Sequence, residues 1–280
     1  MRRSVLALRA VLAACGGSDE PASVRLRFAY EAGDTLTYAY EASGQARLPD
    51  TTAPEGYVER SYERRVTVQE VATELTPRGH YVLSLVYRLE SDGLAPGEAL
   101  PDQVSFQVEI TPQGRVVSVS GVETMKPLFG DIDFQSYFEQ SQPVFPERPL
   151  KVGDSWTQEV RVVSPRAEPV TTSSTYVLES LIEEDGVPLA VIAFDGDIYL
   201  PVTRTAPDSG AGDSTTVVVE ERIRVEGRIH FAHEAGVMRR VDMSSDATFS
   251  RISVGEGEPV RRDVVLRERS SMQLVEPPAE

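Results

Sequence analysis

Alternation of apolar and polar residues with a period of two dominates this chain. Three runs show it most clearly, over residues 81–89, 103–110 and 217–225. Successive side chains of a strand point to opposite faces, so this period predicts half-buried strands with one solvated face. Such strands usually belong to antiparallel sheets. The pattern therefore predicts a mainly β protein.

Short turn signals separate the predicted strands. Each of them ends in a glycine, at a place where a positive φ is expected: Pro77-Arg78-Gly79, Pro112-Gln113-Gly114, Glu184-Asp185-Gly186 and Glu234-Ala235-Gly236. Glycine adopts a positive φ without steric cost, which makes these segments turns between strands. A longer polar segment, residues 203–216, is expected to be a loop.

One segment between the two halves of the β pattern has helical spacing. Its apolar residues recur at i, i+3, i+4 and i+7 after Thr124 as the cap: Met125, Leu128, Phe129 and Ile132. Because Gly130 weakens the pattern, the segment forms either one helix or two short turns. It is expected to end before Pro143.

The two halves resemble each other. Gly33-Asp34-Thr35-Leu36 opens a strand in the first half, and Gly153-Asp154-Ser155-Trp156 opens one in the second. Residues 110–116 match residues 231–237, and the spacing between these two segments is nearly the same as that between the two Gly-Asp segments. A repeat that cannot bury its own face packs against its twin. We therefore expect duplicated antiparallel sheets that form one pseudo-symmetric sandwich or open barrel, with a short helical connector between the halves.

The N-terminal residues have the parts of an export signal. Arg2 and Arg3 supply positive charge, residues 4–14 are mostly apolar, and the run ends in Leu12-Ala13-Ala14-Cys15. This run resembles the lipobox of bacterial lipoproteins. The resemblance implies that the thiol of Cys15 receives diacylglycerol and that the segment before it is removed as a signal peptide. Palmitate and similar chains would then hold the protein at a membrane.

The residues after Cys15 are small and polar, which suits a flexible tether. Gly16, in place of an aspartate, favours the outer membrane over the inner membrane in the lipoprotein families that this signal resembles. The expected organisation is a signal peptide (1–14), an anchor with its tether (15–23), a first β repeat (24–122), a helical connector (123–149), a second β repeat (150–275) and a tail (276–280).

Composition excludes some classes of partner and of stabilising bond. The formal net charge is -16, with 28 basic and 44 acidic residues. A nucleic-acid partner is not expected, because a phosphate-binding surface needs clustered Lys and Arg. Cys15 is the only cysteine, so no disulfide forms within the chain. The apolar core alone must hold the fold.

Candidate catalytic, cofactor and metal residues are weak, and none is assigned. The acidic pairs Asp131/Asp133 and Asp195/Asp197 are interpreted as solvated turn residues, because no EF-hand ligand run surrounds them. His230 and His233 lie three apart in a predicted strand, where they would face opposite sides. No Gly-x-Ser-x-Gly elbow, phosphate loop or dinucleotide fingerprint occurs.

Residues 24–275 resemble an uncharacterised family of bacterial lipoproteins built from two β repeats with Gly-Asp-x-aromatic turns, one of the families of unknown function. Leu36 replaces the aromatic in the first copy. The resemblance implies a fold and an anchor, and no activity. Our first hypothesis is a non-enzymatic protein of the cell envelope or periplasm that binds an envelope protein or an apolar ligand. The alternatives are a hydrolase of envelope polymers with unmarked carboxylates and a structural assembly component.

Overall fold

The computed structural model describes residues 23–50, 52–92, 103–125, 133–162, 169–207, 214–254 and 260–275. Strands make up most of these residues, which confirms the mainly β prediction. Each run with a period of two lies within a strand: β4 (Tyr81–Asp92), β5 (Gln103–Ile110) and β11 (Ser214–Ala232). In β5 the expected face, which includes Phe106, Val108 and Ile110, is buried.

An antiparallel sheet of 11 strands forms the body, in the order β6-β5-β4-β3-β2-β13-β12-β11-β10-β9-β8. The strands not yet introduced are β2 (Thr35–Pro49), β3 (Tyr57–Leu75), β6 (Val116–Ser120), β8 (Ser155–Val162), β9 (Val170–Glu184), β10 (Val187–Pro207), β12 (Val237–Val254) and β13 (Val260–Leu274). Most neighbours follow each other in sequence. The exception joins the two halves of the chain, because β13 pairs with β2 and places Leu274 opposite Tyr38.

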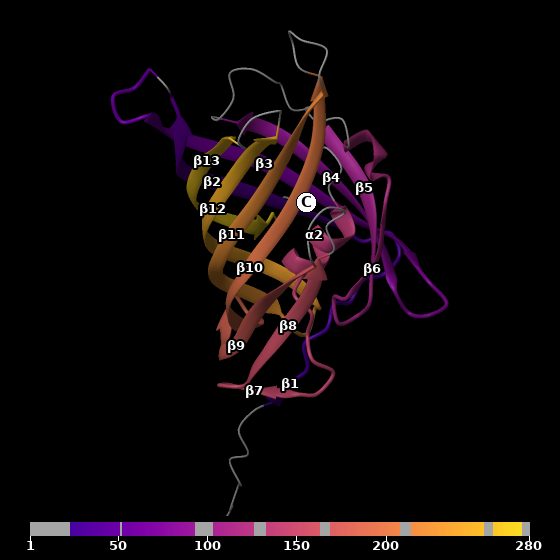
Figure 1. The fold of residues 1–280 in the computed structure, drawn as a ribbon. Coiled ribbons are helices and arrows are strands. Elements are labelled where there is room, and N and C mark those ends of the chain that lie inside the picture. The colour runs from indigo at the N-terminus through magenta and orange to yellow at the C-terminus, as the bar shows by residue number, and fades with distance from the viewer. Residues whose placement is uncertain are drawn as a thin grey trace, which may run out of the picture.

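The sheet curls around the helix α2 (Phe134–Ser141), which lies on its open side (Figure 1). The strand order ends at β6 and β8, and α2 contacts both of these edge strands. Of the two architectures expected from the sequence, the described residues form the open, curved one. A second, two-stranded sheet pairs β1 (Ser23–Val24) with β7 (Leu150–Lys151) at one end of the body.

The helix expected from the spacing of Met125, Leu128, Phe129 and Ile132 can be compared with the structure only at its start. A short 3-10 helix covers Val122–Met125, and the rest of the expected helix, including Leu128, Phe129 and Ile132, lies outside the described residues. The α-helix lies downstream at Phe134–Ser141, where Asp133 caps it by accepting a hydrogen bond from the Ser136 N–H at 3.2 Å. Helices do lie between the two halves, as expected.

Aromatic side chains close the end of the body near β1 and β7. The rings of Phe28, Phe145 and Phe231 pack together, with centroids 4.8 to 5.4 Å apart. All three side chains are almost fully buried. Phe28 and Phe145 come from the two segments that lead into the Gly-Asp turns. The segments before the two Gly-Asp turns therefore contribute side chains to one aromatic cluster, Phe28, Phe145 and Phe231, which we call the aromatic plug of the curved sheet.

Gly114 lets this plug approach the turn between β5 and β6. Its φ is +90°, as the sequence predicted, and a Cβ added there would lie 2.3 Å from the Pro143 carbonyl oxygen and 2.6 Å from the Phe28 ring. The Phe28 N–H donates to the Pro112 carbonyl at 2.7 Å. A side chain at Gly114 would separate these segments. The other three predicted turns also have a glycine with positive φ: Gly79, Gly186 and Gly236.

The expected loop over residues 203–216 is shorter than the pattern indicated. Strand β10 continues to Pro207 and β11 begins at Ser214, with Thr203 paired to Val218. Antiparallel pairing with the neighbouring strand overrides the weak strand preference of these small and polar residues.

Candidate functional site

A cavity of about 600 Å³ lies inside the curved sheet. Inner faces of strands from both halves line it, together with one face of α2. Most lining side chains are apolar or aromatic, for example Val68, Leu85, Phe194, Ile229, Met243 and Ala247. Ligand cavities in proteins commonly have this size and this mixture of an apolar lining with a few polar groups. The cavity is the strongest candidate for a functional site.

Helix α2 forms one wall and is fixed by hydrogen bonds to one edge of the sheet. The buried Gln140 side chain donates to the Tyr199 carbonyl at 3.1 Å and accepts from the Tyr199 N–H at 2.8 Å and from Thr172 Oγ1 at 3.1 Å. On the other side, the ring of Phe138 packs against Phe106, with centroids 5.0 Å apart. This contact with β5 is apolar. The wall is thus pinned to β9 and β10 by a satisfied polar network.

A carboxyl group points into this apolar space. Glu70 lies on β3 between Leu36 of β2 and Leu85 of β4 in the sheet registers. It shares the inner face with Val66 and Val68, which lie two and four positions before it. Its Oε1 atom is buried and has no hydrogen-bond partner, although part of the side chain still faces the cavity. A buried acceptor left without a partner normally costs free energy.

The surroundings of Glu70 alter its titration. Burial raises the pKa of the Glu70 carboxyl, and a hydrogen bond with Tyr30 opposes that rise only in part. Burial, followed by the nearby Glu70 carboxylate, also raises the pKa of the Tyr30 and Tyr38 hydroxyls. Burial is the largest cause of the raised pKa of Tyr87 as well. Glu70 therefore resists ionisation, and tyrosines surround it.

A second carboxyl group faces the same cavity further along the strands. Glu268 on β13 accepts hydrogen bonds from the Tyr40 hydroxyl at 2.8 Å and from the Tyr62 hydroxyl at 2.9 Å. Gly44 of β2 lies between Glu268 and Tyr62, and a Cβ there would lie 2.8 Å from the Tyr62 hydroxyl oxygen. Its missing side chain lets the tyrosine reach across β2. Unlike Glu70, Glu268 has both oxygens bonded.

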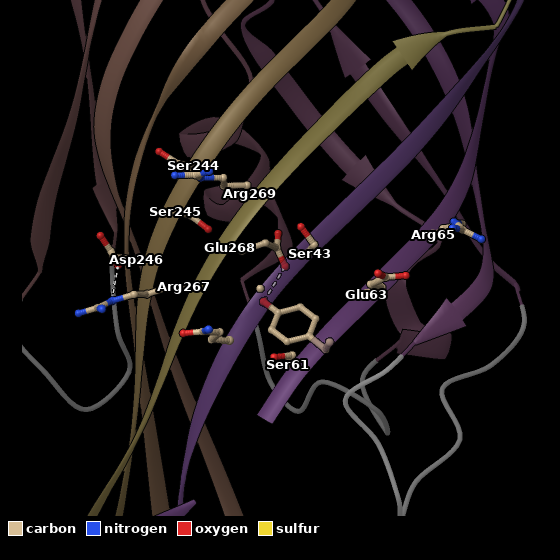
Figure 2. A pocket seen from close by; sticks show the side chains of 13 residues that line it. Ser43, Ser61, Glu63, Arg65, Ser244, Ser245, Asp246, Arg267, Glu268 and Arg269 are labelled. Carbon is tan, nitrogen blue, oxygen red and sulfur yellow. Dashed lines mark hydrogen bonds and ion pairs between the residues drawn. The ribbon is translucent and has the colours of Figure 1, made fainter. Parts of the chain in front are cut away.

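A larger hollow, about 1130 Å³, lies on the outer face of β3, β2, β13 and β12 (Figure 2). It is wide open to solvent, and its side chains are mostly small or charged. Arg267 pairs with Asp246 at 3.3 Å, and Arg65 pairs with Glu41 at 3.7 Å. These exposed pairs contribute little and are screened by salt. Tyr62 and Glu268 line both this hollow and the inner cavity, and Tyr62 is buried. The other side chains of the hollow are small, polar or charged and form no apolar lining, so the inner cavity is the better candidate.

The anchoring residues expected from the sequence cannot be compared with the structure. Leu12, Ala13, Ala14 and Cys15 lie outside the described residues, so the lipid attachment remains a prediction. None of the helices in the described residues has both the length and the apolar character to traverse a bilayer.

The acidic and histidine candidates lie apart from the cavity. Asp195 and Asp197 are exposed residues of β10, not turn residues, and Asp195 pairs with Arg224 at 3.3 Å. The Nε2 atom of the buried His230 lies 3.3 Å from Arg240 and 4.0 Å from Asp242. Among the described residues there is no group of three or more potential metal ligands.

The two Gly-Asp turns have the same geometry. The Asp34 carboxylate accepts from the Glu31 N–H at 2.7 Å, and the Asp154 carboxylate accepts from the Lys151 N–H at 3.0 Å. Each aspartate thus bonds a backbone N–H three residues before it. Trp156 packs against the core, and its Nε1–H donates to the Val144 carbonyl at 3.0 Å. These residues have a structural role.

Sequence reasoning missed Glu70, although a signal was present. The segment from Val66 to Ala72 has the period of a strand, and Glu70 falls on the same face as Val66, Val68 and Ala72. A glutamate on an apolar face is rare unless it is paired. The glutamate within an apolar strand face was visible in the sequence, but only the fold shows that this face lines a cavity.

The raised pKa of Glu70 predicts a pH-dependent stability difference between the parent and Glu70→Gln. Below the ordinary pKa of a glutamate, the group is protonated in both the folded and the unfolded chain. As the pH rises towards the raised folded pKa, the parent should lose about 1.4 kcal/mol per pH unit. The Gln variant cannot ionise, so its relative stability should increase with pH.

Urea unfolding of both proteins between acid and mildly basic pH measures this difference. Glu63→Gln is the matched control, because Glu63 lies on the same strand and is exposed. A difference between the parent and Glu70→Gln that stays constant with pH would contradict the raised pKa.

Three comparisons place the chain among known proteins. No curated protein matches it. Among solved structures, it is similar to lipovitellin, described by its lipid–protein interactions, with 13% identity and a TM-score of 0.46 over 90% of this chain and 26% of that chain. The chain thus spans about a quarter of the lipovitellin chain.

Two further structures are less similar. One is a Bacteroides fragilis NCTC 9343 protein with a YmcC-like fold, described in its name as exported, with 11% identity and a TM-score of 0.25 over 89% of this chain and 97% of that chain. The other is a mutant Rh. blastica porin, with 10% identity and a TM-score of 0.23 over 86% of this chain and 100% of that chain. At these TM-scores we draw no conclusion about this chain from the three similarities.

A family model matches part of the sequence. The match covers residues 122–199, from the 3-10 helix through α2 and into β10. This part contains the second Gly-Asp turn and the helix that walls the cavity. The chain is therefore similar, over residues 122–199, to DUF6263, a family of unknown function.

Proposed function

We propose that this protein is an exported lipoprotein of the cell envelope, anchored through lipid on Cys15, whose curved sheet binds an apolar ligand. The observation that carries the binding part is the cavity of about 600 Å³ with its mainly apolar lining. The export signal and the lipobox support the location. The polar segment after Cys15 would let the body stand away from the membrane.

Burial of a hydrocarbon chain in this cavity would supply a large part of the free energy needed for binding. Each buried methylene contributes about 0.8 kcal/mol, so a chain of about ten carbons would contribute roughly 8 kcal/mol. This is of the same order as the cost of association, which is about 4 to 15 kcal/mol.

A ligand inside the sheet is better supported than a protein partner on an apolar surface. Among the described residues, the exposed large apolar side chains come from four separate segments: Leu75, Val152, Ile182 and Val275. Single apolar residues on a surface are normal and do not mark an interface. The apolar area that needs an occupant faces inward.

Filling the cavity should abolish ligand binding. Ala247 is buried on the inner face of β12 and lines the cavity, so a phenylalanine there would occupy the space of the ligand. We expect Ala247→Phe to bind a fluorescent long-chain probe at least about tenfold more weakly than the parent, because two or more methylenes of contact would be lost. Titration of probe fluorescence measures the affinity.

The control is Thr248→Phe, which places the same side chain on the same strand but on the opposite face. It should bind the probe as the parent does. Equal binding by the parent and Ala247→Phe, or no saturable binding by the parent, would refute the proposal. Circular dichroism of both variants checks that they are folded.

A further inference from the structure

The least explained group in the cavity is the carboxyl of Glu70. Its Oε1 atom is buried without a partner, and the side chain lines the cavity. Its neighbours across the sheet, Leu36 and Leu85, are both apolar. The influences on Glu70 are burial and the hydrogen bond with Tyr30, and no described cation contributes. The fold therefore retains an acid where a leucine or a methionine would pack.

Two features limit the chemistry of a group that could bind there. A carboxylate accepts hydrogen bonds and attracts positive charge. The hydroxyls of Tyr30, Tyr38 and Tyr87 lie near Glu70, and tyrosine rings attract cations that are shielded from water. Tyr30 packs edge to face with Tyr81, with centroids 5.1 Å apart. The charge of the Glu70 carboxylate contributes to the raised pKa of Tyr30, Tyr38 and Tyr87. A carboxylate beside several aromatic rings is suited to an ammonium group.

We propose that Glu70 binds the polar end of the ligand and that this end is a protonated amine on a long apolar chain. This inference rests on the function proposed above and specifies the class of ligand. Burial disfavours the ionised form of Glu70, and the positive charge of the ammonium group favours it, so the two groups form an ion pair. The surrounding tyrosines shield this pair from water.

The cavity gives the rest of such a ligand a path. The inner face of β3 carries Glu70 near one end and Tyr62 near the other, eight positions apart, and both line the cavity. At about 3.3 Å per residue, this face is roughly 26 Å long. Arg64, Val66 and Val68 lie between them and also line the cavity, and the two valines are the nearer to Glu70. An extended hydrocarbon chain that starts at Glu70 would therefore contact apolar side chains along the strand.

Glu268 is the competing acid and is less suitable. Both of its oxygens already accept hydrogen bonds, from Tyr40 and Tyr62. An amine at Glu268 would have to share or displace these tyrosines. At Glu70 the buried Oε1 has no partner, so an ammonium group that reaches it would satisfy an unpaired acceptor.

The test compares three probes with one chain length: dodecylamine, dodecanol and dodecanoic acid. Each displaces a neutral fluorescent long-chain probe near neutral pH, where the amine is protonated. The proteins are the parent, Glu70→Gln, Glu268→Gln and the exposed control Glu63→Gln. Glutamine keeps the shape of glutamate and removes its charge, and circular dichroism verifies folding.

In the parent, the amine should bind at least about tenfold more tightly than the alcohol, because hydrogen bonds to charged groups are stronger than neutral ones. The acid should bind most weakly, since it would bring a second carboxylate beside Glu70. Glu70→Gln should remove the preference for the amine and leave the affinity for the alcohol within about threefold. Glu268→Gln and Glu63→Gln should retain the preference.

The outcomes separate this inference from the proposed function. If the parent binds the neutral probe but does not prefer the amine, or if Glu70→Gln retains the preference, the ligand class is wrong and the apolar site stands. Loss of the preference in Glu268→Gln alone would overturn the assignment to Glu70. If the parent binds none of the probes, the proposed function itself fails.

Discussion

Replacement of Cys15 with alanine should remove the protein from the membrane fraction. Only a thiol accepts the diacylglycerol, and Cys15 is the only cysteine in the chain. At about 0.8 kcal/mol per buried methylene, two long acyl chains contribute more than 10 kcal/mol to membrane attachment. This is the largest single effect that we expect from any substitution.

Detergent phase partition of cell extracts measures this change. The parent should enter the detergent phase almost entirely, and Cys15→Ala should remain in the aqueous phase. Ser18→Ala, in the tether, should behave as the parent does. Equal partition of the parent and Cys15→Ala would exclude the lipid anchor and leave the cavity proposal untouched.

Replacement of Phe231 with alanine should cost about 3 to 5 kcal/mol of stability, the usual range for a buried phenylalanine. Phe231 is fully buried and packs against Phe28 and Phe145, with ring centroids 5.4 and 4.8 Å away. These rings close one end of the curved sheet. With no disulfide available, the loss is a large part of the 5 to 15 kcal/mol typical of a folded domain.

Denaturant unfolding of the parent and Phe231→Ala measures the loss. Tyr57→Ala is the control, because Tyr57 lies at the end of β3, outside the aromatic cluster, with its ring centroid 3.3 Å from the Arg47 guanidinium. The control should cost about 1 kcal/mol or less. If Phe231→Ala costs no more than the control, the aromatic plug does not hold the end of the sheet.

The local pattern of the chain predicted its strands well, for a physical reason. Alternation records which face of a strand is buried, so the faces of β4 and β5 followed directly from residues such as Leu83 and Phe106. Turn glycines such as Gly114 were also predictable, since a positive φ restricts the residue type. Both features depend on neighbours in sequence.

Features that depend on distant residues were not predictable. The pairing of Leu274 with Tyr38 brings the last strand, β13, beside β2 of the first half, and no local pattern specifies it. The helix α2 was not identified from the sequence, although Phe134, Tyr137 and Phe138 have helical spacing and Asp133 supplies its cap. Tertiary contacts decide whether so weak a local signal becomes a helix.

The candidate site was hidden for the same reason. The tyrosines near Glu70 come from the N-terminal lead, β2 and β4, so only folding brings Tyr30, Tyr38 and Tyr87 together. A single glutamate in a strand is an ordinary sequence feature. It becomes informative when the carboxyl group is found facing a cavity with one buried oxygen that has no partner.

Native mass spectrometry of the protein purified from its own cells tests the central claim, that the curved sheet holds a ligand, most directly. The account predicts a bound organic molecule that is released on denaturation, and its absence from Ala247→Phe purified in the same way. A mass equal to the processed chain with its anchor alone, in the parent under native conditions, would contradict the account.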